Sequence, residues 1–137
     1  MKESSSLFKI IDTEPFQISL GERGEMAAWH YLKEQGYELL SKNYRCSYGE
    51  IDVIALREKV ISFVEIKTRR HHYLGAPEEA VDLRKQKKIA QVAQYYLKQT
   101  NQSDAASAFD VLAITWKEGS LPEFKLIKDA FIMEPYV

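Results

Sequence analysis

The sequence predicts a single domain of the mixed α/β class, in which a mixed central sheet is flanked by helices. Read along the chain, the expected elements are a helix, three strands, a second helix and two strands, an order typical of a sheet covered by helices. The chain has 137 residues, enough to bury one core. Its hydrophobic share of 45% and charged share of 28% are those of an ordinary globular protein.

The N-terminal part of the chain divides into an arm and the start of the domain. Residues 1–18 are mixed and serine-rich, which indicates a loose arm before a domain over residues 19–137. A helix is expected from about Leu20 to Gln35. It should end at Gly36, because glycine adopts a positive φ at little energetic cost.

One acidic side chain stands on the apolar face of this first helix. Ala28 and Leu32 are four residues apart and so lie on one face. Glu25 precedes Ala28 by three residues and belongs to the same stripe. A carboxylate on the face that turns toward the core is unusual and marks Glu25 as a candidate functional residue.

The remaining elements follow from alternating apolar residues and from the turn residues between them. The second helix has an apolar stripe at helical spacing, with lysines on its other side. The expected elements are strands over residues 37–45, 50–56 and 60–68, a helix over residues 78–99, and strands over residues 109–116 and 123–131.

Carboxylates interrupt the apolar pattern of the second and third strands. A two-residue turn at Glu58-Lys59 would place Asp52 opposite Glu65 and Glu50 opposite Lys67. A turn with an odd number of residues would instead send Asp52 and Glu65 to opposite faces of the sheet. Two-residue turns are favoured in tight hairpins, so we expect the acids to converge.

Directly opposed carboxylates destabilise a sheet unless a cation lies between them. The hard ions Mg²⁺ and Mn²⁺ prefer such oxygen ligands, and Asp52, Glu65 and Glu25 are the candidate ligands. Lys67 lies two residues after Glu65, on the same side of the strand, where an ammonium can orient water or stabilise charge on a phosphate. A D…E-x-K pattern also arises by chance, and a strand rich in Glu and Lys is often only a solvated edge.

Positive charge follows the E-x-K strand in two clusters, although the net charge of the chain is only −1. Such clusters could contact a phosphate backbone, so nucleic acid is the expected partner. The alternative is a solvated face, and for Lys85 an ordinary solvated helical lysine is the commoner case. The candidate nucleic-acid-binding residues are Arg69, Arg70, Lys85, Lys87 and Lys88.

Composition excludes several other classes of protein. The single cysteine, Cys46, allows neither an intrachain disulfide nor a cysteine zinc cage. No apolar run is long enough to span a bilayer and the start of the chain lacks a signal-peptide core, so a cytoplasmic protein without a membrane partner is expected. His71 and His72 are adjacent in a basic loop and are expected to be exposed.

The motifs together resemble a known family. "GERGEMAAWHYLKEQGYELLSKNYRC", "GEIDVIA", "FVEIKTR" and "FDVLAI" occur here in the order found in the YraN-like family, which is described as uncharacterised and endonuclease-like. That family is placed in the restriction-endonuclease-like superfamily of PD-(D/E)xK nucleases, close to archaeal Holliday junction resolvases. The resemblance implies an αβββαβ core and a Mg²⁺-dependent site that cleaves phosphodiester bonds. Related resolvases are dimers, so it also admits a homodimer.

By position, the resemblance implies catalytic roles for Glu25, Asp52, Glu65 and Lys67. One residue departs from the family pattern: arginine commonly precedes F-D-V, whereas this chain has Ala108.

Supporting residues are expected around these four. Glu50 matches the family's G-E-I-D, and Asp110, inside an apolar strand, is a candidate to support the site from behind.

Three functions are therefore weighed. The first is a metal-dependent nuclease acting on DNA, with branched or otherwise structured DNA as a candidate substrate. The second is a non-catalytic nucleic-acid-binding or accessory protein that retains the nuclease fold. The third is an interaction module in which the acids form salt bridges with lysines.

Overall fold

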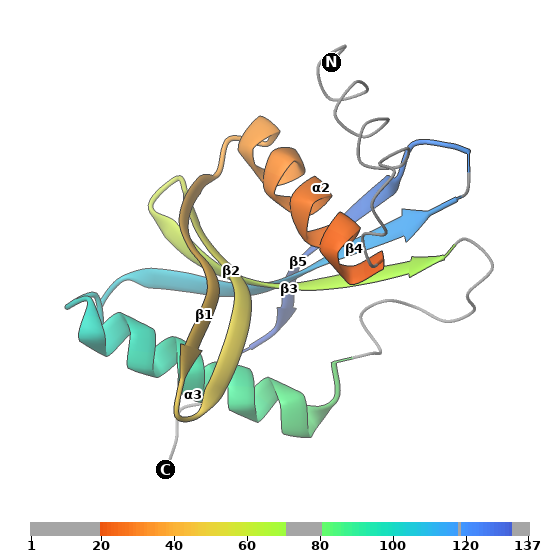
Figure 1. Cartoon of the computed structure of the whole chain (residues 1–137). Coiled ribbons are helices and arrows are strands. Elements are labelled where there is room, and N and C mark those ends of the chain that lie inside the picture. The colour runs from red at the N-terminus through yellow and green to blue at the C-terminus, as the bar shows by residue number, and fades with distance from the viewer. Residues whose placement is uncertain (1–19, 71–80, 118, 133–137) are drawn as a thin grey trace.

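The computed structural model describes residues 20–70, 81–117 and 119–132. Within these residues, five strands form one sheet in the order β1-β2-β3-β4-β5, and two helices pack against it (Figure 1). The sheet is mixed, because β3 and β4 are parallel whereas the other neighbouring pairs are antiparallel. The predicted fold class is confirmed, and the arrangement is consistent with a restriction-endonuclease-like core.

The observed elements follow the expected order closely. The structure has α2 (Leu20–Glu34), β1 (Glu38–Cys46), β2 (Gly49–Arg57), β3 (Val60–Arg70), α3 (Leu83–Gln99), β4 (Ala106–Trp116) and β5 (Glu123–Phe131). Gly36 has a φ of 93°, as expected for the residue that ends α2. None of the helices described is long and apolar enough to cross a membrane.

The second helix starts later than predicted, at Leu83 and not at residue 78. Asp82 has extended backbone angles, and its side chain accepts a hydrogen bond of 2.9 Å from the backbone N–H of Lys85. Asp82 is therefore the N-cap, and the apolar pattern alone had extended the helix too far. The expected arm at residues 1–18, together with His71 and His72, lies outside the described residues.

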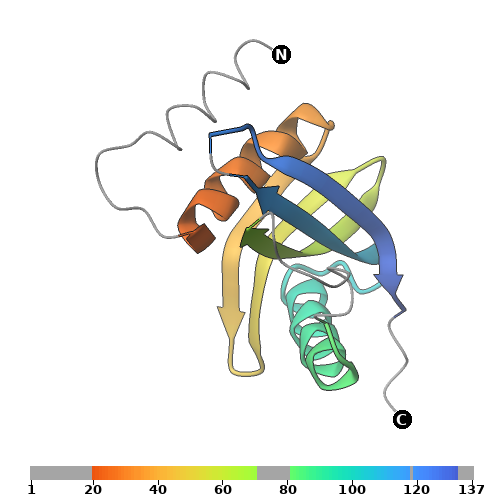
Figure 2. The same ribbon diagram turned by 90° about the vertical axis from the view of Figure 1, so that its right-hand side faces the viewer.

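The two helices lie on opposite faces of the sheet (Figures 1 and 2). On one face, Ala28 and Leu32 of α2 share a buried cluster with Val64 of β3. Gly24 allows this helix to approach β3 closely, because an added Cβ would lie only 2.8 Å from Thr68 Cβ. The close approach brings the next residue, Glu25, near β3.

On the other face, α3 packs its apolar stripe against the sheet and connects the parallel strands β3 and β4. Its residues Val92 and Ala93 share a second buried cluster with Ile54 of β2 and Phe63 of β3. Parallel neighbours need such a crossover connection, which explains the position of the helix between them in sequence. This face carries the candidate site.

The β2–β3 turn sets the register that the sequence predicted. Glu58 and Lys59 have φ values of 51° and 66°, the left-handed pair of a two-residue hairpin turn. The pairing runs from Arg57–Val60 to Val53–Val64 and then stops, while β2 continues to pair with β1 as far as Gly49. The strands β2 and β3 therefore separate next to Asp52 and Glu65.

Candidate active site

The carboxylate of Asp52 lies at the point where β2 leaves β3. Its Oδ2 accepts a hydrogen bond of 2.8 Å from the backbone N–H of Ile66. The ladder between the two strands has ended here, so the side chain supplies the acceptor that a paired strand would have provided. This bond anchors the carboxyl group of Asp52 against β3.

Glu65 is buried on the face covered by α3, two residues after Phe63. Its Oε1 lies 2.6 Å from the Nζ of Lys85 and 3.7 Å from the Nζ of Lys67. Glu65 is only 9% exposed, and its buried charge is balanced by two ammonium groups at close range. We call Asp52, Glu65, Lys67 and Lys85 the carboxylate site.

The direct contact between Lys85 and Glu65 was not predicted, and the alternative that Lys85 is a solvated helical lysine is wrong. Lys85 lies in the first turn of α3, because the N-cap is Asp82. The side chain of Lys85 extends from there to β3, where its Nζ contacts Glu65. The N-cap was the signal in the sequence that could have placed Lys85 there.

Electrostatic crowding is strongest at Asp52. Burial and the negative charge of Glu65 raise the pKa of Asp52 to about 6. The hydrogen bond from Ile66 N–H and the charge of Lys85 act in the opposite direction and only partly offset this rise. A positive charge added near Asp52 would therefore stabilise its ionised form.

The two lysines of the site influence each other in opposite senses. Burial lowers the pKa of Lys67, and the neighbouring Lys85 lowers it further. Burial also disfavours the charged form of Lys85, but its hydrogen bonds to Glu65 and Lys67 outweigh burial and raise its pKa. The same site therefore lowers the pKa of Lys67 and raises that of Lys85.

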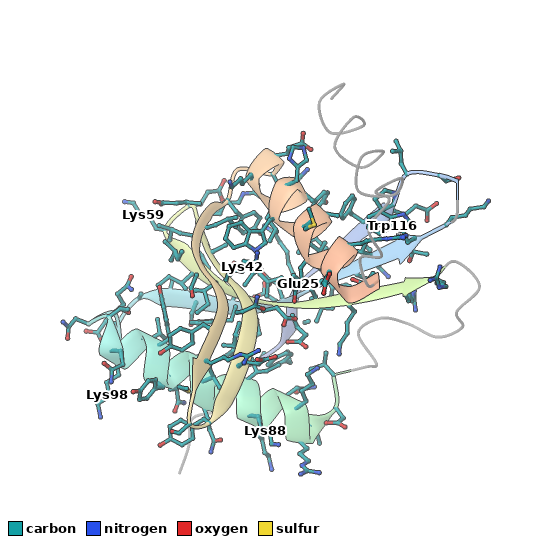
Figure 3. The ribbon with its side chains drawn as sticks, in the orientation of Figure 1. Glu25, Lys42, Lys59, Lys88, Lys98 and Trp116 are labelled. Atoms are coloured by element: carbon teal, nitrogen blue, oxygen red, sulfur yellow. The ribbon has the colours of Figure 1, made fainter. Side chains whose placement is uncertain are left out.

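Glu25 approaches the site from α2. Its half-buried side chain extends from the first half of the helix (Figure 3), and its charge contributes to the raised pKa of Asp52. Among the residues that the structure describes, however, no group of three or more His, Cys, Asp or Glu side chains is close enough to hold a metal ion. The structure therefore brings Asp52 and Glu65 together, and Glu25 lies near them without completing a group of three metal ligands.

The predicted basic residues lie on two elements beside the site. Arg69 and Arg70 end β3, four and five residues after Glu65. Lys87 and Lys88 are exposed on α3, shortly after Lys85. Figure 3 shows that Lys88 points away from the sheet. Of these cations, Lys85 contacts Glu65, and the others extend the positive charge outward.

Asp110 does not support the carboxylate site. It pairs with Val64, whose side chain belongs to the face covered by α2, so Asp110 and Glu65 lie on opposite faces. Its Oδ1 accepts a hydrogen bond of 2.9 Å from the backbone N–H of Asp129, and Ser62 donates another. Burial raises the pKa of Asp110, and these two hydrogen bonds only partly offset the rise.

Ala108, the residue that departs from the family pattern, belongs to the same region as Asp110. Both line a hollow of about 280 Å³, together with Ser62 and Arg57, and we call this the Asp110 hollow. Ala108 pairs with Ser62, two residues before Asp110, and so shares its face of the sheet. The arginine common in the family would therefore lie at the Asp110 hollow and not at the carboxylate site.

Glu50 also lies apart from the site, and its expected pairing with Lys67 is wrong. The β2–β3 ladder ends at Val53, three residues beyond Glu50. Glu50 instead pairs with Arg45 of β1, with 2.7 Å between Nε and Oε2, and both side chains are exposed.

Comparison with known proteins places the chain in a family. The profile of "Uncharacterised protein family UPF0102" matches residues 24–114, a range that includes every member of the carboxylate site. A UPF0102 protein of Geotalea uraniireducens is 44% identical over 113 residues, which cover 82% of this chain and 89% of the relative. A second, from Syntrophus aciditrophicus, is 47% identical over 116 residues, covering 83% and 89%. A third, from Clostridium perfringens, is 40% identical over 117 residues, covering 85% and 96%. The chain belongs to UPF0102, the YraN-like family that its motifs resemble.

Proposed function

We propose that this protein is a metal-dependent nuclease that hydrolyses phosphodiester bonds in DNA, with branched or otherwise structured DNA as the expected substrate. The observation that carries the proposal is the pairing of Asp52 and Glu65, two crowded carboxylates, beside Lys67 and Lys85. Nothing in the packing of the sheet requires acids here, and a site of this kind recurs where enzymes need perturbed pKa values.

The donor set fits Mg²⁺ or Mn²⁺. Both ions prefer oxygen ligands, and Mg²⁺ is commonly held by one or two carboxylates while waters and substrate phosphates complete its coordination. Asp52 and Glu65 would hold the ion, with Glu25 adding negative charge from α2. The ammonium of Lys85 at 2.6 Å from Glu65 marks a position where positive charge is already stabilised. A bound cation would polarise the phosphoryl oxygen and make water a better nucleophile.

The residues of the chain then have distinct roles. The ammonium of Lys67, beside Glu65, would orient the attacking water or stabilise the charge that develops on the phosphate. If Glu65 held the ion, the ammonium of Lys85 would be available to a phosphate oxygen. The surrounding cations Arg69, Arg70, Lys87 and Lys88 would contact the DNA backbone.

A cleavage screen tests this function. The native protein is incubated with linear, single-stranded, flapped and four-way DNA in Mg²⁺ or Mn²⁺, with a chelator as the blank. We expect metal-dependent cleavage that falls about 100-fold or more in Lys67→Ala, the loss typical of removing one donor that stabilises the transition state. Lys125→Ala removes an exposed lysine of β5 and should cleave as the native protein does. Absence of cleavage of all four substrates in both metals would refute the proposal.

A second candidate is a non-catalytic nucleic-acid-binding protein. The Glu65–Lys85 ion pair favours it, because this pair balances the charge of the buried acid without any metal. On this alternative, DNA binding persists without cleavage, and Mn²⁺ leaves the melting temperature unchanged.

A further inference from the structure

A groove of about 440 Å³ lies between the β1–β2 turn and α3, apart from the residues of the carboxylate site. One of its walls is the turn, and the other is one face of the helix. We call it the Tyr48 groove. Its lining residues are Tyr48, Gln91, Gln94, Tyr95, Lys98 and Gln99.

Two exposed aromatic rings meet in this groove. Tyr48 is 51% exposed and Tyr95 is 36% exposed, and their ring centroids are 6.1 Å apart at an interplanar angle of 60°. By contrast, the neighbouring Tyr96 is buried and packs its ring edge against Tyr44 in the core. Tyr48 and Tyr95 therefore present aromatic surface to solvent, which folding does not require of a turn residue.

The backbone holds the turn against the helix. Gly49, next to Tyr48, has a φ of 141°, a value that L side chains rarely adopt. A Cβ at this position would lie 3.5 Å from Val92 Cγ2, so the turn is in van der Waals contact with α3. Figures 1 and 2 both show the turn beside the helix. The relative position of Tyr48 and Tyr95 is thus set by packing.

The helix that forms the other wall carries only positive charge. The 17 residues of α3 include five basic residues and no acidic residue, although the net charge of the whole chain is −1. Lys88, Gln91, Tyr95 and Lys98 follow one another at spacings of three or four residues and so form one stripe. Lys88 and Lys98 both point away from the sheet (Figure 3) and lie about 15 Å apart along the helix. A polyanion is the complementary partner for such a stripe.

We propose that the Tyr48 groove binds unpaired nucleotides of a DNA substrate. Bases stack on Tyr48 and Tyr95, phosphates contact Lys88 and Lys98, and the amide of Gln91 is within the same stripe to contact a base edge. The ligand is an unpaired strand and not a duplex, because aromatic side chains need the face of a base, which a duplex keeps within its own stack. That the nucleic acid is DNA rests on the proposed function.

The direction of the helix connects the groove with the carboxylate site. Lys85 contacts Glu65 in the first turn of α3, and Gln91 begins the groove six residues later, about 9 Å along the axis. A strand that follows the positive stripe therefore runs between the groove and the carboxylates. The groove would select substrates in which unpaired DNA adjoins the bond to be cleaved.

Fluorescence anisotropy with a labelled oligothymidine of about 15 nucleotides tests the proposal. Binding is measured in chelator, so that cleavage does not interfere, and a blunt duplex of the same length is the comparison. We expect Tyr48→Ala and Tyr95→Ala each to weaken single-strand binding by about 5-fold to 150-fold, the range implied by one stacked base. Tyr48→Phe and Tyr95→Phe keep the rings and should bind as the native protein does, and duplex affinity should be the same in all variants.

Lys98→Gln provides a second measurement. Removing one phosphate contact should reduce the slope of log K against log salt by about 0.7 for the single strand. The proposal is overturned if both alanine variants bind the single strand as the native protein does, or if they lose duplex affinity to the same extent.

The binding test of the Tyr48 groove can be distinguished from the cleavage test of the proposed nuclease. Lys125→Ala, at an exposed position on β5, should bind the oligothymidine as the native protein does. A native protein that binds through the tyrosines but cleaves nothing supports the groove and refutes the nuclease. A protein that cleaves DNA while the alanine variants bind normally supports the nuclease and refutes the groove.

Discussion

The carboxylate site and the Asp110 hollow both bury acidic side chains on the neighbouring strands β3 and β4, but they satisfy these acids differently. Asp110 accepts hydrogen bonds from the backbone N–H of Asp129 and from Ser62, which are fixed by the sheet. Glu65 is instead balanced by the Nζ atoms of Lys67 and Lys85, which end long side chains with several rotatable bonds.

The difference indicates which acid can exchange partners. The backbone N–H of Asp129 cannot leave Asp110 without disrupting a strand. A lysine ammonium can swing away from Glu65 when a cation or phosphate arrives, because only side-chain rotamers change. The Asp110 hollow is therefore interpreted as a structural feature, and the carboxylate site as the place where a ligand can bind.

The largest expected effect on stability is that of Asp110→Ala. It leaves the buried Ser62 hydroxyl and the partly buried Asp129 N–H without their acceptor, and an unsatisfied buried donor costs about 1–3 kcal/mol. We expect the free energy of unfolding to fall by about 3 kcal/mol in chemical denaturation. Asp110→Asn keeps an acceptor oxygen and removes a buried charge, so it should remain close to the native protein. Equal losses of stability in Asp110→Ala and Asp110→Asn would show that the negative charge of Asp110 is what matters. That result would contradict the interpretation that hydrogen bonds alone satisfy this acid.

The next effect is the gain from a metal ion. A ligand that binds only the folded state at a hundred times its Kd adds about 2.7 kcal/mol. Mn²⁺ should therefore raise the melting temperature of the native protein, and Asp52→Asn or Glu65→Gln should lose most of that rise. Glu123→Gln, an exposed position on β5, is the matched control and should keep it. A rise retained in Asp52→Asn would place the ion elsewhere.

A smaller effect is expected for Asp52→Asn in chelator. The rise in the pKa of Asp52 from 3.8 to about 6 corresponds to about 3 kcal/mol against its charged form. Weakening the hydrogen bond from Ile66 N–H offsets part of this, so we expect the variant to be about 1–2 kcal/mol more stable at pH 8.

The pH dependence of that gain has a definite sign. The native state holds the Asp52 proton more tightly than the unfolded state does, so native stability falls as the pH rises from about 4 through about 6. The advantage of Asp52→Asn should therefore be absent near pH 4, grow between pH 4 and 6, and be constant above pH 7. Denaturation curves at these pH values measure it, and a destabilised variant at pH 8 would favour a salt-bridge role for Asp52.

The smallest effect is expected for Glu50→Gln. The Arg45–Glu50 pair is exposed on both sides, and exposed pairs contribute about 0–1 kcal/mol. The melting temperature and any metal-dependent cleavage should remain those of the native protein within about 0.5 kcal/mol. A loss of cleavage in this variant would extend the carboxylate site beyond the end of the β2–β3 ladder.

Local patterns predicted most of the fold. The alternation of apolar residues located the five strands, and the turn at Glu58-Lys59 gave the register from Arg57–Val60 to Val53–Val64. Periodicity did not locate the start of α3, because the apolar stripe of the helix begins only at Ile89, well after its first residue. There the N-cap Asp82 decided the boundary.

The sequence by itself determined that Asp52 and Glu65 would converge, because the turn and the two-residue period of a strand are local properties. Only the tertiary structure decided which cation meets Glu65 and on which face Asp110 lies. Lys85 reaches Glu65 across 20 residues of sequence, because the fold brings the start of α3 within side-chain reach of β3. The face of Asp110 depends on the parallel register of β3 and β4, which no turn between them specifies. Alternation divides the residues of one strand between the two faces of the sheet. Only the pairing of two strands shows which residues of the neighbouring strand share each face.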